Sequence, residues 1–159
     1  MRKILTLTKV PILIKQLKTD TKTIVLAGGC FDILHQGHIE YLKAAKKQAD
    51  ILMVGLENDA NVTRLKGKGR PINKEKIRAV NLIKTGLVNY VIILPTLKTG
   101  ADYLKMVKII QPDIIAVTRG DPQIANKQKQ ANIIGGKLKI VIDRLSGLST
   151  TKIINNTNL

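Results

Sequence analysis

Two histidines that lie three positions apart, His35 and His38, are the residues best placed to do chemistry in this chain. An apolar run, 24–27, and a glycine-bearing connection, 28–32, precede them, and residues from about His38 onward have helical spacing. A helix starting there would place its unpaired N–H groups and the positive end of its dipole beside both imidazoles. Gly37 and the upstream glycines would let phosphate oxygens approach the backbone closely. The segment therefore predicts a phosphate-binding site.

Two other segments are rich in residue types that bind phosphate. The first is basic, since residues 64–78 contain Arg64, Lys66, Lys68, Arg70, Lys74, Lys76 and Arg78 against one acid, Glu75. Lysine supplies a point charge there, whereas arginine can bind a phosphate through two parallel hydrogen bonds. The second is Ser149–Thr151, where Ser149 suits a helix N-cap whose following N–H groups could bind an anion. Taken alone, a basic segment is also typical of solvated surface, and a serine N-cap is typical of any helix.

The elements that must position these segments follow a regular alternation. Short apolar runs rich in β-branched residues alternate with longer segments of helical period. This pattern predicts an α/β fold, a Rossmann-like doubly wound parallel sheet of about five strands with helices on both faces. The strands are expected near 24–27, 51–56, 88–94, 113–117 and 138–142. The helices are expected over about 10–17, 38–48, 74–84, 101–110 and 122–134.

The candidate phosphate-binding segments all fall in or begin in the loops that follow the expected strands. In a doubly wound sheet, ligands bind beyond the carboxyl ends of the strands, where the strand order switches. The loops at that edge are expected at 28–38, 57–70, 118–121 and 143–151. The histidine pair, the basic segment and the Ser-Thr-Thr segment should therefore meet at one edge of the sheet.

The formal net charge of +16 comes from 27 Lys and Arg residues against 11 Asp and Glu residues. This charge suits a basic nucleic-acid-binding module, which is the non-enzymatic alternative, but it suits anionic small molecules equally well. Aromatic residues make up 3% of the chain and leave few platforms for stacked bases, so no nucleic-acid partner is expected. One cysteine, Cys30, and no long apolar run predict a soluble cytoplasmic protein with no membrane partner.

Three stretches together resemble the cytidylyltransferase-like nucleotidyltransferases. That family's signature reads glycine, any residue, phenylalanine and aspartate, then histidine, any residue, glycine and histidine, which here are Gly29–Asp32 and His35–His38. Residues 144–154 resemble the family's C-terminal motif, and residues 64–72 resemble its basic loop. The resemblance implies a single nucleotidyltransferase domain over 1–159. Such a domain transfers a nucleoside monophosphate from a nucleoside triphosphate to a substrate phosphate and releases pyrophosphate.

The resemblance also assigns roles to individual residues. It implies catalytic roles for His35, His38, Lys66 and Arg144, nucleotide contacts from Gly29, Cys30, Phe31, Asp32, Gly37, Arg119, Gly120, Asp121, Ser149, Thr150 and Thr151, and contacts with the substrate or its phosphate from Asp59, Lys68, Arg70 and Arg78. Gly67 and Gly69 would make the basic loop a mobile flap. Mg²⁺ is expected to accompany the triphosphate, because phosphates and few protein ligands commonly hold it. No protein-bound metal is expected, since the chain has no further cysteine or histidine to close a zinc site.

Within the family, the chain looks closest to the adenylyltransferase domain of the bifunctional ADP-heptose synthesis enzyme. The similar stretches are 28–35, 38–42, 58–60, 64–73 and 135–137. Members of that group transfer AMP from ATP to a heptose 1-phosphate. After Gln111–Asp113 they usually have a lysine, two glycines, aspartate and tyrosine, whereas this chain reads Arg119-Gly120-Asp121-Pro122.

That departure leaves the nucleotide and the acceptor open. Glycerol-3-phosphate cytidylyltransferases, which use CTP, share the pattern of 144–153, and archaeal-type FAD synthetases, which adenylate FMN, are a third alternative. The expected partners are thus ATP or CTP and a phosphorylated small-molecule acceptor. The resemblance further implies a homodimer and a separate sugar kinase that makes the acceptor.

Overall fold

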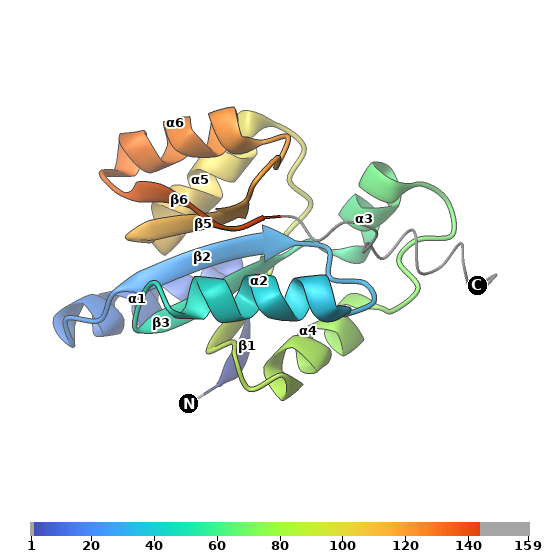
Figure 1. Cartoon of the computed structure of the whole chain (residues 1–159), viewed down its shortest axis with the longest axis horizontal. Coiled ribbons are helices and arrows are strands. Elements are labelled where there is room, and N and C mark those ends of the chain that lie inside the picture. Colours follow the sequence, from blue (N-terminus) through green and yellow to red (C-terminus); the bar gives the residue numbers. More distant parts are fainter. Residues whose placement is uncertain (1, 144–159) are drawn as a thin grey trace.

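The computed structural model describes residues 2–143, which form one six-stranded parallel sheet with helices on both faces (Figure 1). The strands are β1 (Lys3–Thr6), β2 (Ile24–Gly29), β3 (Ile51–Leu56), β4 (Tyr90–Ile93), β5 (Ile114–Thr118) and β6 (Lys137–Ile142). The helices are the short 3-10 helix η1 (Leu7–Lys9), then α1 (Val10–Thr19), α2 (Gln36–Lys46), α3 (Asp59–Lys66), α4 (Glu75–Lys84), α5 (Gly100–Ile110) and α6 (Ile124–Ile134). The expected Rossmann-like α/β fold is confirmed.

The two faces of the sheet have separate apolar cores. Along β2, Ile24 and Leu26 join the cluster formed with α1, α5 and α6, whereas Val25 and Ala27 join the cluster formed with α2 and α4. Successive strand residues alternate between the faces, so a strand covered on both sides must be apolar throughout. This explains why the central strands read as continuous apolar runs in the sequence.

In the strand order, β1-β4-β3-β2-β5-β6, the chain leaves β2 toward one side of the sheet and later continues on its other side. From β2 the chain moves through β3 to β4 on one side, and it then returns through α5 to β5 on the other side of β2. The switch point therefore lies between the carboxyl ends of β2 and β5, where doubly wound sheets bind their ligands. The segment 28–38 and the segment 118–121 both emerge there.

Three features of the fold differ from the sequence-based prediction. The sheet has a sixth strand, β1, which pairs with β4 at the sheet edge and has no fully buried residue to give it an apolar pattern. Helix α3 occupies part of the expected loop 57–70, and it buries only Asn61 and Val62. Helix α2 begins at Gln36 instead of His38. Within residues 2–143, no helix is both long and apolar enough to span a lipid bilayer.

Candidate active site at the carboxyl edge of the sheet

The two histidines interlock at the start of α2. His35 is the N-cap residue, and its side chain accepts a hydrogen bond from the His38 N–H at 3.3 Å, while the His35 N–H donates to His38 Nδ1 at 3.4 Å. Their rings stack with centroids 3.8 Å apart and planes 19° apart. The pair thus forms a reciprocal capping box that fixes both imidazoles against the helix start. Gly37 lies between them in the first turn, half-buried.

The surroundings of both imidazoles favour the neutral form. Burial, followed by the proximity of His35, lowers the pKa of His38 to about 4, and burial also lowers the pKa of His35. Because His35 Nδ1 accepts the backbone hydrogen bond, its proton resides on Nε2, which remains a donor. Neutral imidazoles donate hydrogen bonds but supply no net charge. Positive charge for a bound anion must therefore come from other residues.

The glycine loop supports the histidines by packing. Phe31 is 4% exposed, has a positive φ of 47°, and places its ring centroid 5.1 Å from that of His38. A Cβ atom on Gly29 would lie 2.9 Å from the Phe31 ring, so no larger residue fits there without a shift. Gly29 and Phe31 were both expected to contact the nucleotide; here Phe31 packs against His38, and Gly29 leaves room for the Phe31 ring.

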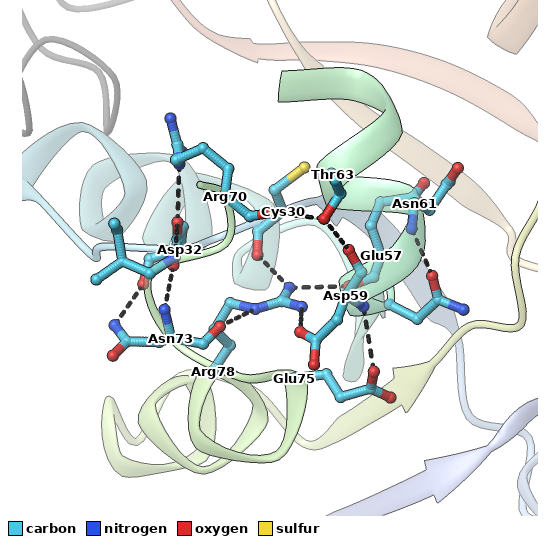
Figure 2. A network of polar contacts seen from close by, with 12 residues as sticks. Cys30, Asp32, Glu57, Asp59, Asn61, Thr63, Arg70, Asn73, Glu75 and Arg78 are labelled. Atoms are coloured by element: carbon cyan, nitrogen blue, oxygen red, sulfur yellow. Dashed lines mark hydrogen bonds and ion pairs between the residues drawn. The ribbon is translucent and has the colours of Figure 1, made fainter. Parts of the chain in front are cut away.

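Asp32 faces the basic loop. Its carboxylate is 0% exposed and accepts hydrogen bonds from Arg70 Nε at 3.0 Å, Ile72 N at 2.7 Å and Asn73 N at 2.8 Å (Figure 2). Burial alone would raise the pKa of Asp32, but the backbone hydrogen bonds from Asn73 and Ile72 and the Arg70 guanidinium outweigh burial and lower it. Asp32 was expected to contact the nucleotide, and here its carboxylate is engaged by Arg70, Ile72 and Asn73.

Arg78 is also turned inward. Its side chain is 0% exposed, and it donates to the carbonyl oxygens of Asn73 at 2.9 Å, Cys30 at 2.8 Å and Glu57 at 2.8 Å, and to Asp59 Oδ1 at 2.8 Å (Figure 2). It joins α4 to the ends of β2 and β3. Arg78 was expected to contact a substrate phosphate, but in this structure its guanidinium is enclosed by protein groups. Asp59, another expected substrate contact, has its carboxylate paired with Arg78.

The basic loop divides into an exposed tip and a fastened arm. We define the tip as Lys66–Gly69 and the arm as Arg70–Asn73. Every residue of the tip is exposed, and Gly67 and Gly69 have positive φ values of 100° and 88°. Within the part of the chain that the structure describes, neither tip lysine forms an ion pair. Asp32 thus fastens the arm, and the fully exposed part of the expected flap is confined to the tip.

Lys66 lies near enough to the glycine loop to interact electrostatically with Cys30. Burial raises the pKa of Cys30, and the Lys66 charge is the largest influence that lowers it. The Cys30 thiol is half-buried, and its backbone carbonyl is held by Arg78. The tip therefore places a cation on the same side of the sheet edge as the histidine pair.

Two sets of residues beside the site were not indicated by the sequence. Asn73 donates from Nδ2 to the Asp32 carbonyl at 2.9 Å, and an asparagine directly before an expected helix was the only available signal. Glu57, which is 7% exposed, accepts hydrogen bonds from the Tyr103 hydroxyl at 2.7 Å and from Asn61 Nδ2 at 2.5 Å. This second network joins β3, α3 and α5.

The residues after β5 lie across the switch point from the histidines. Arg119 forms an exposed ion pair with Asp143 at 2.5 Å, and Asp121 pairs with Lys127 at 2.7 Å. Gly120 has a positive φ of 81°, which favours glycine. The remaining expected site residues, Arg144, Ser149, Thr150 and Thr151, lie outside the described residues.

A parallel sheet with a capped histidine pair at a helix start beside its switch point defines a class of α/β proteins built to bind phosphates. Residues 26–156 match the model of the Cytidylyltransferase-like family. This chain belongs to that family and is a nucleotidyltransferase. The match includes both the histidine pair and the basic loop.

Similar proteins agree with this assignment. The bifunctional protein HldE of Nitratiruptor sp. is 40% identical over 146 residues, which cover 92% of this chain and 30% of the relative. HldE of Pseudomonas fluorescens is 38% identical over 156 residues, which cover 96% of this chain and 31% of the relative. The chain thus spans less than a third of the length of these curated relatives.

Solved structures agree as well. The crystal structure of the lipopolysaccharide core biosynthesis protein from Thermoplasma volcanium GSS1 is 36% identical with a TM-score of 0.61, over 77% of this chain and 96% of that one. A pantoate–β-alanine ligase from Francisella tularensis has a TM-score of 0.74 at 14% identity, over 100% of this chain and 73% of that one. The second similarity concerns the fold alone.

Proposed function

We propose that this protein transfers AMP from ATP to a sugar phosphate of the heptose 1-phosphate type and releases pyrophosphate. The observation that carries the proposal is the interlocked, neutral histidine pair at the start of α2, beside the switch point. The relatives named HldE and the lipopolysaccharide core biosynthesis protein support a sugar phosphate as the acceptor. A homodimer, a sugar kinase that supplies the acceptor and a cytoplasmic location are parts of the same proposal.

The chemistry requires no covalent enzyme intermediate. An oxygen of the acceptor phosphate attacks the α-phosphorus of the triphosphate and forms a new P–O bond, while the bond to the bridging oxygen breaks and its electron pair leaves with pyrophosphate. Such a transfer depends on alignment and on neutralisation of charge. His35 Nε2–H would donate to a phosphate oxygen, and the helix start would add its backbone N–H groups. Lys66 and Lys68 would supply the positive charge that the neutral histidines lack.

Mg²⁺ is proposed to enter with the triphosphate. Within residues 2–143, no group of three His, Cys, Asp or Glu side chains could hold a metal ion. Asp32 and Asp59 are already engaged by Arg70 and Arg78. The donor set therefore fits an ion held mainly by phosphate oxygens, whose chemistry would be charge neutralisation on the leaving pyrophosphate.

A pyrophosphate-release assay tests the proposal. The protein is incubated with Mg²⁺, with either ATP or CTP, and with heptose 1-phosphate, glycerol 3-phosphate or FMN as acceptor. We expect release with ATP and heptose 1-phosphate. Release only with CTP and glycerol 3-phosphate would identify the cytidylyltransferase alternative, and release only with ATP and FMN would identify an FAD synthetase. No release from any pair would contradict the proposed reaction.

A further inference from the structure

We propose that Asp32 and Arg78 are positioning residues that hold the arm Arg70–Asn73 against the glycine loop and thereby fix the tip lysines relative to the histidine pair. The inference rests on the proposed function, since the tip lysines matter only if phosphates bind beside the histidines. In this proposal neither residue contacts the substrate directly, in contrast to the roles that the family resemblance implies for them. Their contribution to the reaction is transmitted through Lys66 and Lys68.

The first observation is the direction of the hydrogen bonds at Asp32. One carboxylate accepts two backbone N–H groups, from Ile72 and Asn73, and one guanidinium N–H, from Arg70. In return, Asn73 Nδ2 donates to the Asp32 carbonyl at 2.9 Å. The arm is therefore bound to one residue of the glycine loop by both backbone and side-chain groups. Charge-assisted hydrogen bonds of this kind are stronger than neutral ones and favour one geometry.

The second observation is that Arg78, on α4, binds both the arm and the glycine loop. It binds the Asn73 carbonyl at the end of the arm and the Cys30 carbonyl in the glycine loop with separate N–H groups. A guanidinium presents its five donors in a rigid plane, so the four acceptors around Arg78 have fixed relative positions. Lysine, with its donors on one nitrogen atom, could not span them.

The third observation links the fastened arm to the reacting groups. The tip begins at the end of α3 and leads directly into the arm, where Thr63 Oγ1 donates to the Arg70 carbonyl at 2.6 Å. On the other side, Asp32 directly follows Phe31, whose ring packs against His38. The tip lysines and the histidine pair are thus connected through the hydrogen bonds between Asp32 and the arm. A displacement of about 1 Å in such a link can lower a reaction rate about a hundredfold.

A matched control exists at the opposite edge of the sheet. Asp50 accepts hydrogen bonds from Thr23 N at 2.8 Å and Thr23 Oγ1 at 2.9 Å, just before β3 begins. It is therefore also a carboxylate that holds a neighbouring backbone N–H, but it lies at the amino ends of the strands. Asp50→Asn removes a similar interaction without disturbing the proposed site.

The test is a double-mutant cycle. Lys66→Ala is made in the wild-type, Asp32→Asn and Asp50→Asn backgrounds, and kcat and KM for pyrophosphate release are measured on folded protein. We expect Lys66→Ala to lower kcat about a hundredfold in the wild-type and Asp50→Asn backgrounds but only a few-fold after Asp32→Asn, because the lysine is then already misplaced. An equal loss in all three backgrounds would mean that Asp32 is merely structural and would overturn the inference.

A second readout separates this inference from the proposed function. Binding of inorganic tripolyphosphate is measured by calorimetry through the same cycle, and we expect Lys66→Ala to weaken it about tenfold in all backgrounds except Asp32→Asn. If no substrate pair gives turnover, the proposed function fails. The tripolyphosphate-binding cycle then tests the positioning role of Asp32 by itself. Equal weakening throughout, or no binding by the wild-type protein, overturns the inference. If Asp32→Asn does not fold, Asn73→Ala replaces it, with an expected coupling of about threefold.

Discussion

The tip and the arm of the basic loop are adjacent in sequence, yet they use their cations in different ways. Lys66 and Lys68 of the tip are exposed, whereas Arg70 is nearly buried and Arg78, just beyond the arm, is fully buried. The residue types suit the two tasks. A lysine is a mobile point charge that can follow a phosphate, and an arginine is a planar set of donors that can hold several fixed acceptors. A uniformly basic segment therefore contains both proposed contact residues and positioning residues.

The largest effect that would break this comparison is expected from Arg78→Lys. A lysine leaves several buried acceptors, including the Cys30 and Asn73 carbonyls, without donors. We expect the free energy of unfolding to fall by about 3 kcal/mol, as it does when a buried charged network loses a partner. Chemical denaturation monitored by circular dichroism measures it. A loss under about 0.5 kcal/mol, the size typical of surface changes, would show that Arg78 is not a structural clamp.

The opposite pattern is expected for Lys68→Ala in the tip. Its side chain is exposed and forms no ion pair within residues 2–143, so the stability should change by less than about 0.5 kcal/mol. The value of kcat/KM should nevertheless fall about tenfold, with Lys68→Arg restoring most of it, because charge is what matters there. Steady-state kinetics and thermal unfolding of both variants provide the check. A large loss of stability with full activity would show that Lys68 has a structural role and does not contact a phosphate.

How far the sequence could predict this arrangement depends on the kind of residue. The central strands were predictable because burial on both faces demands continuous apolar runs, and the carboxyl-edge loops followed from the fold. The inward turn of Arg78 was not predictable. On α4, Ile77 is 52% exposed and Val80 is 41% exposed while Arg78 is fully buried, which is the reverse of what apolar periodicity indicates. The carbonyl oxygens that surround Arg78 belong to the backbone, so the pattern of apolar side chains cannot indicate them.

The candidate site shows the same limit. The histidine spacing correctly marked a helix start, but the reciprocal cap that moves the start of α2 to Gln36 depends on side-chain geometry. Asp32 belongs to a recognisable motif, and only its three donors reveal that it holds the arm. Motifs thus pointed to candidate residues, while contacts determined which of them face inward.

A smaller effect that sharpens the comparison concerns acid stability. The folded-state pKa of Asp32 lies below its ordinary value of 3.8, so its contribution to stability is complete above that pH and is lost as the pH falls through the folded pKa. We expect Asp32→Asn to be less stable than the wild-type protein at neutral pH and to lose less stability between pH 4 and pH 2. Denaturation curves across this range measure the difference. Parallel pH profiles for the two proteins would show that an ionised Asp32 carboxylate does not stabilise the arm.

A further effect concerns the histidine pair, which favours the neutral form in contrast to the charged tip. Because the pKa of His38 is lowered to about 4, its contribution to stability is complete above its ordinary pKa of 6.5 and is lost as the pH falls through 4. We expect the His38 ring resonances in NMR spectra to titrate near pH 4. Titration near 6.5 would show that the imidazole is not held in the buried, neutral form.

Pyrophosphate release by the wild-type protein and by His38→Ala tests the central claim most directly. With Mg²⁺, ATP and heptose 1-phosphate, we expect turnover by the wild-type protein and a loss of about a hundredfold in kcat for His38→Ala. The His38 ring stacks on His35 and accepts its backbone N–H, so its removal would release the His35 donor from its fixed position. Thermal unfolding confirms that the variant is folded. Undiminished turnover by folded His38→Ala, or no turnover by the wild-type protein with any nucleotide and acceptor pair, would contradict the account.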